Sequence, residues 1–116
     1  MNSYAPFIGP IKMQDAAVAT GNGTAIRCVD GSNGAMTTVT CQVQGTFSAT
    51  ITFEGTVDNT NWVAIGFTSL ADGTTTATTA TAAGLFRATV LGLQQVRARV
   101  SGYVSGTCNV TGIAVG

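Results

Sequence analysis

From about residue 36 onward, apolar and polar residues alternate along the chain. Successive side chains of a β-strand point to opposite faces, so a period of two is typical of strands with one buried face. The alternation slips once, at Gly112, which predicts a β-bulge in the last strand with Ile113 and Val115 returning to the buried side. The residues predicted to point inward before this slip are Val39, Cys41, Val43, Ala49, Ile51, Phe53, Phe86, Ala88, Val90, Val96, Ala98, Val100, Cys108 and Val110.

Short segments rich in Gly, Asn and Asp separate the alternating runs, and these residues tolerate the backbone angles of turns. No segment has the 3.6-residue apolar period of a helix, and the frequent Thr and Val favour strands. The sequence therefore predicts an all-β fold: a single antiparallel β-sandwich of residues 16–116, jelly-roll-like, with about eight strands.

Two stretches depart from this pattern. Residues 1–15 contain both prolines and are predicted to form an extended N-terminal arm. We expect the apolar side chains of this arm to contact a partner; they are Tyr4, Phe7, Ile8 and Ile11. The alternative is that the arm forms a terminal strand on the protein's own sheet. Residues 74–84 alternate Thr with Ala and predict either a flat edge strand or a loop.

The overall composition excludes several classes of protein. Only 9% of the 116 residues are charged, and the five acidic and five basic residues balance to zero. Nucleic-acid binding, which needs a basic surplus, is therefore not expected. No run of 18 apolar residues and no signal-peptide pattern occurs, so we expect synthesis in the cytoplasm and no membrane partner. A weakly charged surface instead favours a protein that docks against others.

Candidate catalytic and metal chemistry is sparse, so we expect neither an enzyme nor a cofactor. The chain has no histidine, which excludes Ser-His and Cys-His nucleophiles, and its five carboxylates are scattered near predicted turns. No Cys-x-x-Cys pair offers a zinc site. The segment from Asp58 to Asn61 breaks the calcium-loop pattern at its third and sixth positions. Cys28, Cys41 and Cys108 are predicted to be free thiols, because a hairpin about residues 31–34 places Cys28 opposite Thr37.

Two surface features remain as candidate binding sites. A hairpin about residues 91–94 would place Arg87 across from Arg97 and Arg99, on one face of a sheet. This cationic patch could bind carboxylates of a partner. The alternative is that the three arginines are only solvated by water. A second hairpin about residues 58–61 would use a type I turn with Asp58 accepting backbone N–H bonds. Trp62 then either covers the core or rim, or forms a sugar-binding platform with Asn59 and Asn61.

The segments FEGTVDNTNWVAIGF and LFRATVLGLQQVRARVSGYVSGTCNVTGIAVG resemble a pattern common in virion proteins of tailed bacteriophages, over about residues 47–116. The usual Asp-Gly of the turn is Asp-Asn here. The resemblance implies a non-enzymatic capsid decoration or cement protein on the virion surface. Its partners would be the major capsid protein or other virion proteins, and it would form a homo-oligomer, with a trimer favoured. The same turn-then-Trp pattern also resembles discoidin-like carbohydrate-binding sandwiches. The alternative function is thus a glycan-binding or receptor-binding module of a tail or baseplate.

Overall fold

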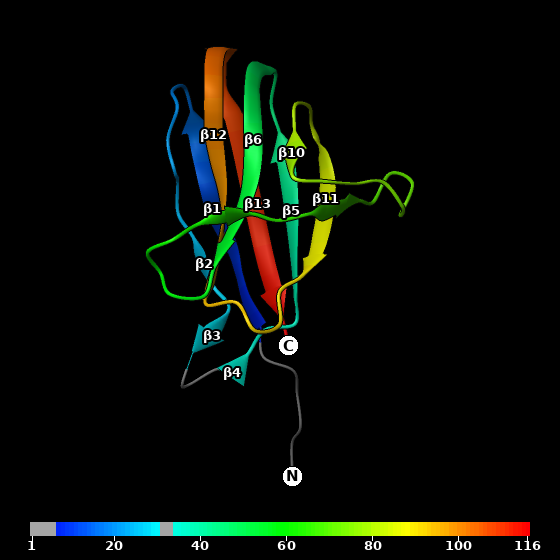
Figure 1. The fold of residues 1–116 in the computed structure, drawn as a ribbon. Helices are drawn as coiled ribbons and strands as arrows, with labels where there is room; N and C mark the ends of the chain where they lie inside the picture. The colour runs from blue at the N-terminus through cyan, green and yellow to red at the C-terminus, as the bar shows by residue number, and fades with distance from the viewer. Residues whose placement is uncertain (1–6, 31–33) are drawn as a thin grey trace.

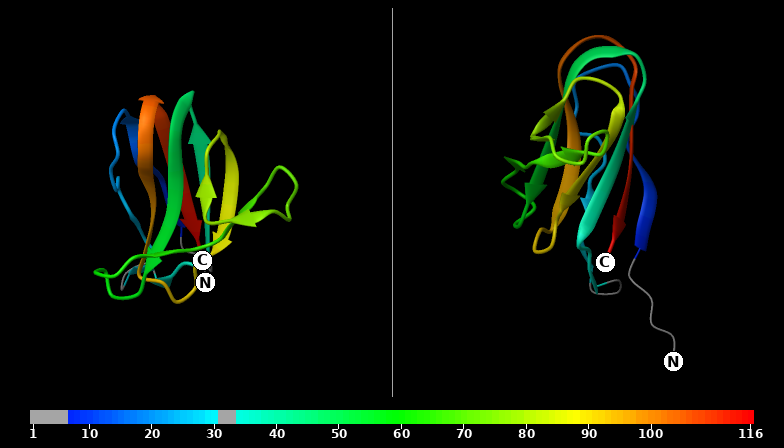
Figure 2. Two further views of the ribbon diagram at one scale, coloured as in Figure 1. Left: turned by 45° about the horizontal axis from the view of Figure 1, so that its top comes forward. Right: turned by 90° about the vertical axis from the view of Figure 1, so that its right-hand side faces the viewer.

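The computed structural model describes residues 7–30 and 34–116, and in them two antiparallel sheets pack face to face (Figure 1). The view in the right half of Figure 2 shows the two layers edge-on. One sheet has the strand order β1 (Phe7–Ala17), β13 (Cys108–Val115), β5 (Thr38–Gln44), β11 (Gly84–Thr89), β8 (Phe67–Ser69) and β9 (Thr76–Ala77). The predicted all-β sandwich is confirmed.

The second sheet has the order β10 (Thr79–Ala80), β6 (Phe47–Thr56), β12 (Gln95–Gly106) and β2 (Ile26–Arg27), and β7 (Val63–Ala64) also pairs with β6. A separate two-stranded ribbon joins β3 (Val29–Asp30) to β4 (Gly34–Ala35). We call the two large sheets the six-stranded and the five-stranded sheet.

The core lies between the two inner faces and combines residues that the alternation predicted with others that it did not, among them Met13, Ile26, Met36 and Phe67. The fully buried ones among the predicted residues are Val39, Cys41, Val43, Ile51, Phe53, Val90, Val96, Ala98, Val100, Cys108 and Val110, while Ala49 and Phe86 are partly buried against the same cluster. Phe53 of β6 stacks on Phe67 of β8 with ring centroids 4.3 Å apart, and the Phe86 ring lies 5.5 Å away. These rings join the two sheets, because Phe53 comes from one and its two partners come from the other.

The bulge predicted at Gly112 is wrong. Residues 109–115 of β13 pair in turn with residues 44–38 of β5 without a register shift. Gly112 keeps the inward position, where a Cβ atom would lie 2.7 Å from both Ile26 Cδ1 and Met13 Sδ. Ile113 and Val115 therefore alternate outward. The alternation slips in the sequence because the side chains of Met13 and Ile26 fill the space at the inward position of Gly112. The register shifts occur between β1 and β13, where β1 has the extra residues.

Most of the predicted N-terminal arm is a strand of the sandwich. Residues 7–17 form β1, which pairs with β13 at the edge of the six-stranded sheet, and Ile8 and Ile11 pack against the protein's own core. The terminal-strand alternative thus describes residues 7–15, which belong to the sandwich. Tyr4 and the side chain of Phe7 lie outside the described residues.

The chain changes sheets at several connections between consecutive strands, and this overturns the predicted hairpin about residues 91–94. β11 pairs with β5 and β8 in the six-stranded sheet, whereas β12 pairs with β6 and β2 in the five-stranded sheet. The β5–β6 and β12–β13 connections cross in the same way. Arg87 is therefore on the opposite side of the sandwich from Arg97 and Arg99.

The Thr-Ala segment closes one side of the sandwich with two very short strands. β9 pairs with β8 in the six-stranded sheet, and after a bend at Thr78 β10 pairs with β6 in the five-stranded sheet. The N–H of Phe53 donates to the carbonyl of Thr78 at 2.9 Å, which fixes the crossing point. The segment is an edge, as one of the two alternatives predicted, and its shortness limits the length that another chain could pair with.

All three cysteines are free and buried, in agreement with the sequence prediction. Burial raises the pKa of Cys28 to about 11 and that of Cys41 to about 12, and it also raises the pKa of Cys108. Because the thiolate is the reactive form, these side chains act as small apolar residues of the core.

Replacing Phe53 by Ala should remove the central ring that packs against both Phe67 and Phe86. A buried Phe→Ala change costs about 3–5 kcal/mol of unfolding free energy, because apolar contact is lost and a cavity remains. Urea unfolding followed by circular dichroism would measure this loss. Val104→Ala, at a side chain 74% exposed, is the matched control and should change stability little. Equal stability of the two variants would contradict the assignment of Phe53 to the centre of the core.

Candidate functional site

The outer face of the five-stranded sheet carries a carboxylate shared by two arginines. Glu54 of β6 lies directly opposite Arg97 of β12, and Arg99 lies opposite Thr52, one step along the same face. Glu54 Oε1 accepts from Arg97 Nε at 2.8 Å, and Glu54 Oε2 lies 3.2 Å from Arg99 Nε. The Glu54 residue is only 8% exposed, so its charge depends on these partners.

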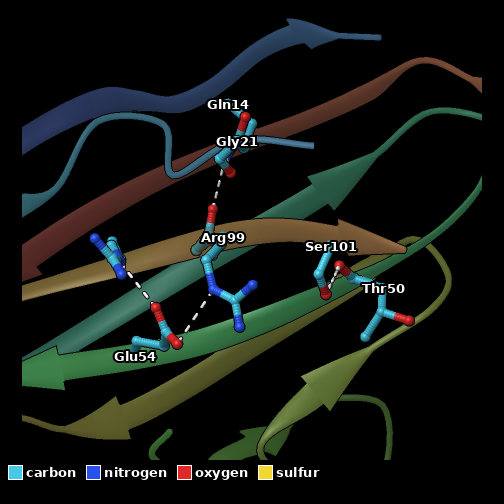
Figure 3. A network of polar contacts seen from close by, with 8 residues as sticks. Gln14, Gly21, Thr50, Glu54, Arg99 and Ser101 are labelled. Atoms are coloured by element: carbon cyan, nitrogen blue, oxygen red, sulfur yellow. Dashed lines mark hydrogen bonds and ion pairs between the residues drawn. The ribbon is translucent and has the colours of Figure 1, made fainter. Parts of the chain in front are cut away.

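Each arginine contacts Glu54 through its Nε. Figure 3 shows the two terminal nitrogens of Arg99 directed away from the carboxylate, on the side of Ser101 and Thr50. The Arg99 side chain is 32% exposed and that of Arg97 is 16% exposed. Two cations share one anion, so this part of the face has an excess of one positive charge and guanidinium donors available to an outside acceptor.

Trp62 covers part of this arginine pair. Its ring centroid lies 4.0 Å from the guanidinium carbon of Arg97, a cation–π arrangement, and the side chain is half-buried. The structure thus places Trp62 on the outer face of the sheet, at its rim rather than in the core. The stacked indole shields the Arg97–Glu54 pair from water and orients Arg97.

The segment that brings Trp62 over the sheet is held by Asp58. Its Oδ1 accepts from the backbone N–H groups of Thr60 at 2.9 Å and Asn61 at 2.8 Å, and its Oδ2 accepts from the Asn61 side-chain amide at 2.7 Å. The predicted role of Asp58 is confirmed, but the four-residue loop is wrong, since six residues separate β6 from β7. Bonds from the Asn61 backbone, the Asn61 amide, the Thr60 backbone and the Thr56 hydroxyl lower the pKa of Asp58.

The residues of the proposed sugar site lie in this same loop. Asn59 has a positive φ of 64°, and its Oδ1 accepts from Gln95 Nε2 at 2.9 Å. Asn61 is engaged with Asp58. The loop therefore brings Asn59, Asn61 and Trp62 to one end of the arginine face. Gln95 was not among the predicted site residues.

Sequence reasoning found Arg97 and Arg99 but missed their partner and misplaced Arg87. Glu54 was grouped with the carboxylates near predicted turns, although it follows the inward Phe53 and must face outward like the two arginines. The alternation alone places Glu54 on an outer face. Only the pairing of β6 with β12 shows that this is the face of the two arginines. Arg87 instead lies on the outer face of the six-stranded sheet, opposite Thr40 and Thr68.

Two other kinds of site are absent from residues 7–30 and 34–116. No group of three or more His, Cys, Asp or Glu side chains there could hold a metal ion. No helix in that part of the chain is long and apolar enough to cross a membrane.

The fold and the paired arginines define a small all-β sandwich with a cationic sheet face. Residues 9–114 match the XepA family, and the chain belongs to that family. Among curated proteins, no sequence matches.

Two solved structures share the fold. SPBc2 prophage-derived protein YomS superposes with a TM-score of 0.84 at 19% identity, over 100% of this chain and 98% of that one. PBSX exported protein XepA superposes with a TM-score of 0.87 at 20% identity, over 100% of this chain. The chain spans 40% of the length of that XepA chain.

Asp58→Asn should weaken the loop that carries Trp62. A carboxylate whose pKa is lowered by folding stabilises the protein above its ordinary pKa of 3.8, and this contribution is lost as the pH falls through the folded-state value. The variant should therefore be less stable than wild type at about pH 7, and the difference should shrink toward about pH 2. Urea unfolding at both pH values tests this. Asp15→Asn, in the exposed pair with Lys12, is the control; a difference independent of pH would contradict the role of Asp58.

Proposed function

We propose that this chain is a structural protein of a bacteriophage particle, a capsid decoration or cement protein that binds the assembled shell through protein–protein contacts. Membership of the XepA family and the fold shared with prophage-derived YomS support the relation to phage. Sparse charge and a surface rich in Thr, Ala and Gly support a docking role without catalysis. In this proposal the protein is made in the host cytoplasm and resides on the capsid surface.

The observation that carries the proposal is the sharing of Glu54 by two arginines. Because Arg99 uses Nε for Glu54, its terminal nitrogens point away from that carboxylate and can form the two parallel bonds that a partner carboxylate accepts. Glu54 and Trp62 hold the pair in place before binding, so little side-chain entropy remains to be lost. The proposed partner is therefore an acidic surface of the major capsid protein or of another virion protein.

Binding to the assembled shell but not to its separated subunits would stabilise the shell by mass action. A homo-oligomer, with a trimer as the favoured state, would present several copies of the arginine face together. Such copies raise the effective concentration of each contact and allow a weak single contact to give stable occupancy.

Arg99→Gln should reduce the occupancy of the chain on purified particles about tenfold, the effect of losing about 1.4 kcal/mol of binding free energy. Arg99 is the better choice than Arg97 because the Arg97–Glu54 pair then remains intact. Quantitative mass spectrometry of particles at low and high salt measures occupancy, which should also fall with salt. Lys12→Gln removes one positive charge from the opposite sheet and should have no effect. Absence of the chain from purified particles, or equal occupancy of the two variants, would refute the proposal.

A second candidate function, glycan or receptor binding by a tail or baseplate module, is favoured by one observation. Trp62 is partly exposed and lies in the same loop as the amides of Asn59 and Asn61, a combination that can stack on and hydrogen-bond a sugar. A glycan array with the whole chain tests it. Glycan binding that is abolished by Trp62→Ala but retained by Val63→Ala, an exposed neighbour, would establish this alternative. If the chain binds no glycan on the array, the alternative is wrong.

A further inference from the structure

The outer face of the six-stranded sheet carries a second surface that the proposed function does not use. We propose that this face binds an extended segment of a partner protein in which an apolar side chain and a carboxylate are two residues apart. Arg87 would receive the carboxylate, and the hollows beside Leu85 would receive the apolar side chain. This inference does not depend on the role proposed for Arg97 and Arg99.

Arg87 is an exposed cation on β11. Within residues 7–30 and 34–116, no carboxylate lies within 4.0 Å of its guanidinium nitrogens. Asp72 precedes Gly73, which lines the same hollow as Arg87. The Asp72 carboxylate accepts from the Thr75 hydroxyl and from the backbone N–H groups of Thr74 and Thr75. These bonds lower the pKa of Asp72 to about 2 and occupy its oxygens.

The surroundings of Arg87 form a polar hollow of about 320 Å³. It is lined by Thr38, Gly66, Thr68, Gly73, Arg87, Ala88 and Thr89. The glycines keep the rim low, and the threonine hydroxyls can donate to an oxyanion that the guanidinium holds. A guanidinium fork with neighbouring hydroxyl donors fits a carboxylate and offers no pocket for a large apolar group.

The next outward residue of β11 lies in a different environment. Leu85, two residues before Arg87 and therefore about 7 Å from it on the same face, is 45% exposed. It lines a groove of about 450 Å³ together with Leu70 and Ala71, and on its other side a hollow of about 180 Å³ together with Pro10 and Ile113. An exposed leucine between two apolar hollows can bury a partner's apolar side chain on either side.

The spacing of these two environments determines the chemistry of the partner. Leu85 and Arg87 point outward from one strand, so an extended segment lying along β11 presents matching side chains at positions i and i+2. The positive charge of Arg87 favours an acidic residue at the position that faces it. The groove beside Leu85 favours an apolar residue at the other position. Because this face is opposite the arginine face, a chain that uses both would join two partners.

A direct test uses the whole protein and a synthetic peptide, acetyl-Ser-Thr-Leu-Thr-Glu-Thr-Ser-amide, followed by amide NMR shifts and calorimetry. Binding should shift the amides of β5, β8 and β11 and leave β6 and β12 unchanged. Arg87→Gln and Leu85→Ser should each weaken binding about tenfold, equivalent to about 1.4 kcal/mol. A peptide with Gln in place of Glu should bind wild type more weakly than the original peptide does. The Arg87→Gln variant should bind the two peptides equally.

Arg27→Gln is the matched control, because Arg27 is exposed on β2 of the five-stranded sheet. It should bind the peptide like wild type, and circular dichroism should show all variants folded. No peptide binding, shifts centred on the five-stranded sheet, or equal loss in Arg27→Gln would overturn the proposal. So would binding of free glucuronate as tightly as the peptide, or Arg87-dependent self-association in place of peptide binding. None of these results depends on particle occupancy, so this proposal and the proposed function fail separately.

Discussion

The packing of Phe53 against Phe67 and Phe86 is the contact on which the rest of the structure depends. It joins the middle of the five-stranded sheet to the part of the six-stranded sheet formed by β8 and β11. Without such burial neither sheet would be stable, since each has one apolar face that must be removed from water. Because most apolar side chains are used between the sheets, both outer faces carry mainly Thr, Gln and a few charges, with Leu85 and Ile113 as apolar exceptions. Both proposals made above place partners on these outer faces.

The few charges on those faces are placed according to how much water reaches them. Glu54 is nearly buried and is held by two arginines, one of them covered by Trp62, because an isolated carboxylate at that depth would be costly. Arg87 is exposed and needs no internal partner, since water solvates it. In the proposed function, the first arrangement is held in place before a partner binds. In the further proposal, Arg87 gains an ion pair only when a partner supplies the acid, which would favour acidic partners over neutral ones.

The sequence predicted what depends on neighbouring positions and failed where distant strands meet. The alternation identified the inward residues from Val39 to Val100, because side-chain direction in a strand is a local property. The pairing of strands is not local: β11 and β12 are consecutive, yet they lie in different sheets. The prediction that placed Arg87 beside Arg97 therefore failed, and Glu54 was overlooked for the same reason.

Gly112 shows the same limit in the core, because its inward position is explained only by Met13 and Ile26, residues far away in the sequence. The candidate site was predicted in part for a similar reason. The Asp58 turn is encoded within four residues, so its hydrogen bonds could be foreseen from the sequence. The position of Trp62 over Arg97 joins residues 35 positions apart and requires the pairing of β6 with β12.

The two outer faces are separated by the full thickness of the sandwich, and this separation has a consequence for how the protein could work. Stacked sheets lie about 10 Å apart, and their outward side chains extend further still, so Arg87 and Arg99 share no neighbours. Substitutions at such distant sites act additively unless the protein changes conformation between them. The rings of Phe53, Phe67 and Phe86 fill the space between the sheets and oppose sliding of one over the other. The sandwich thus holds its two faces at a fixed distance, so in the two binding modes proposed above it would act as a spacer between partners rather than as a switch that transmits a signal from one to the other.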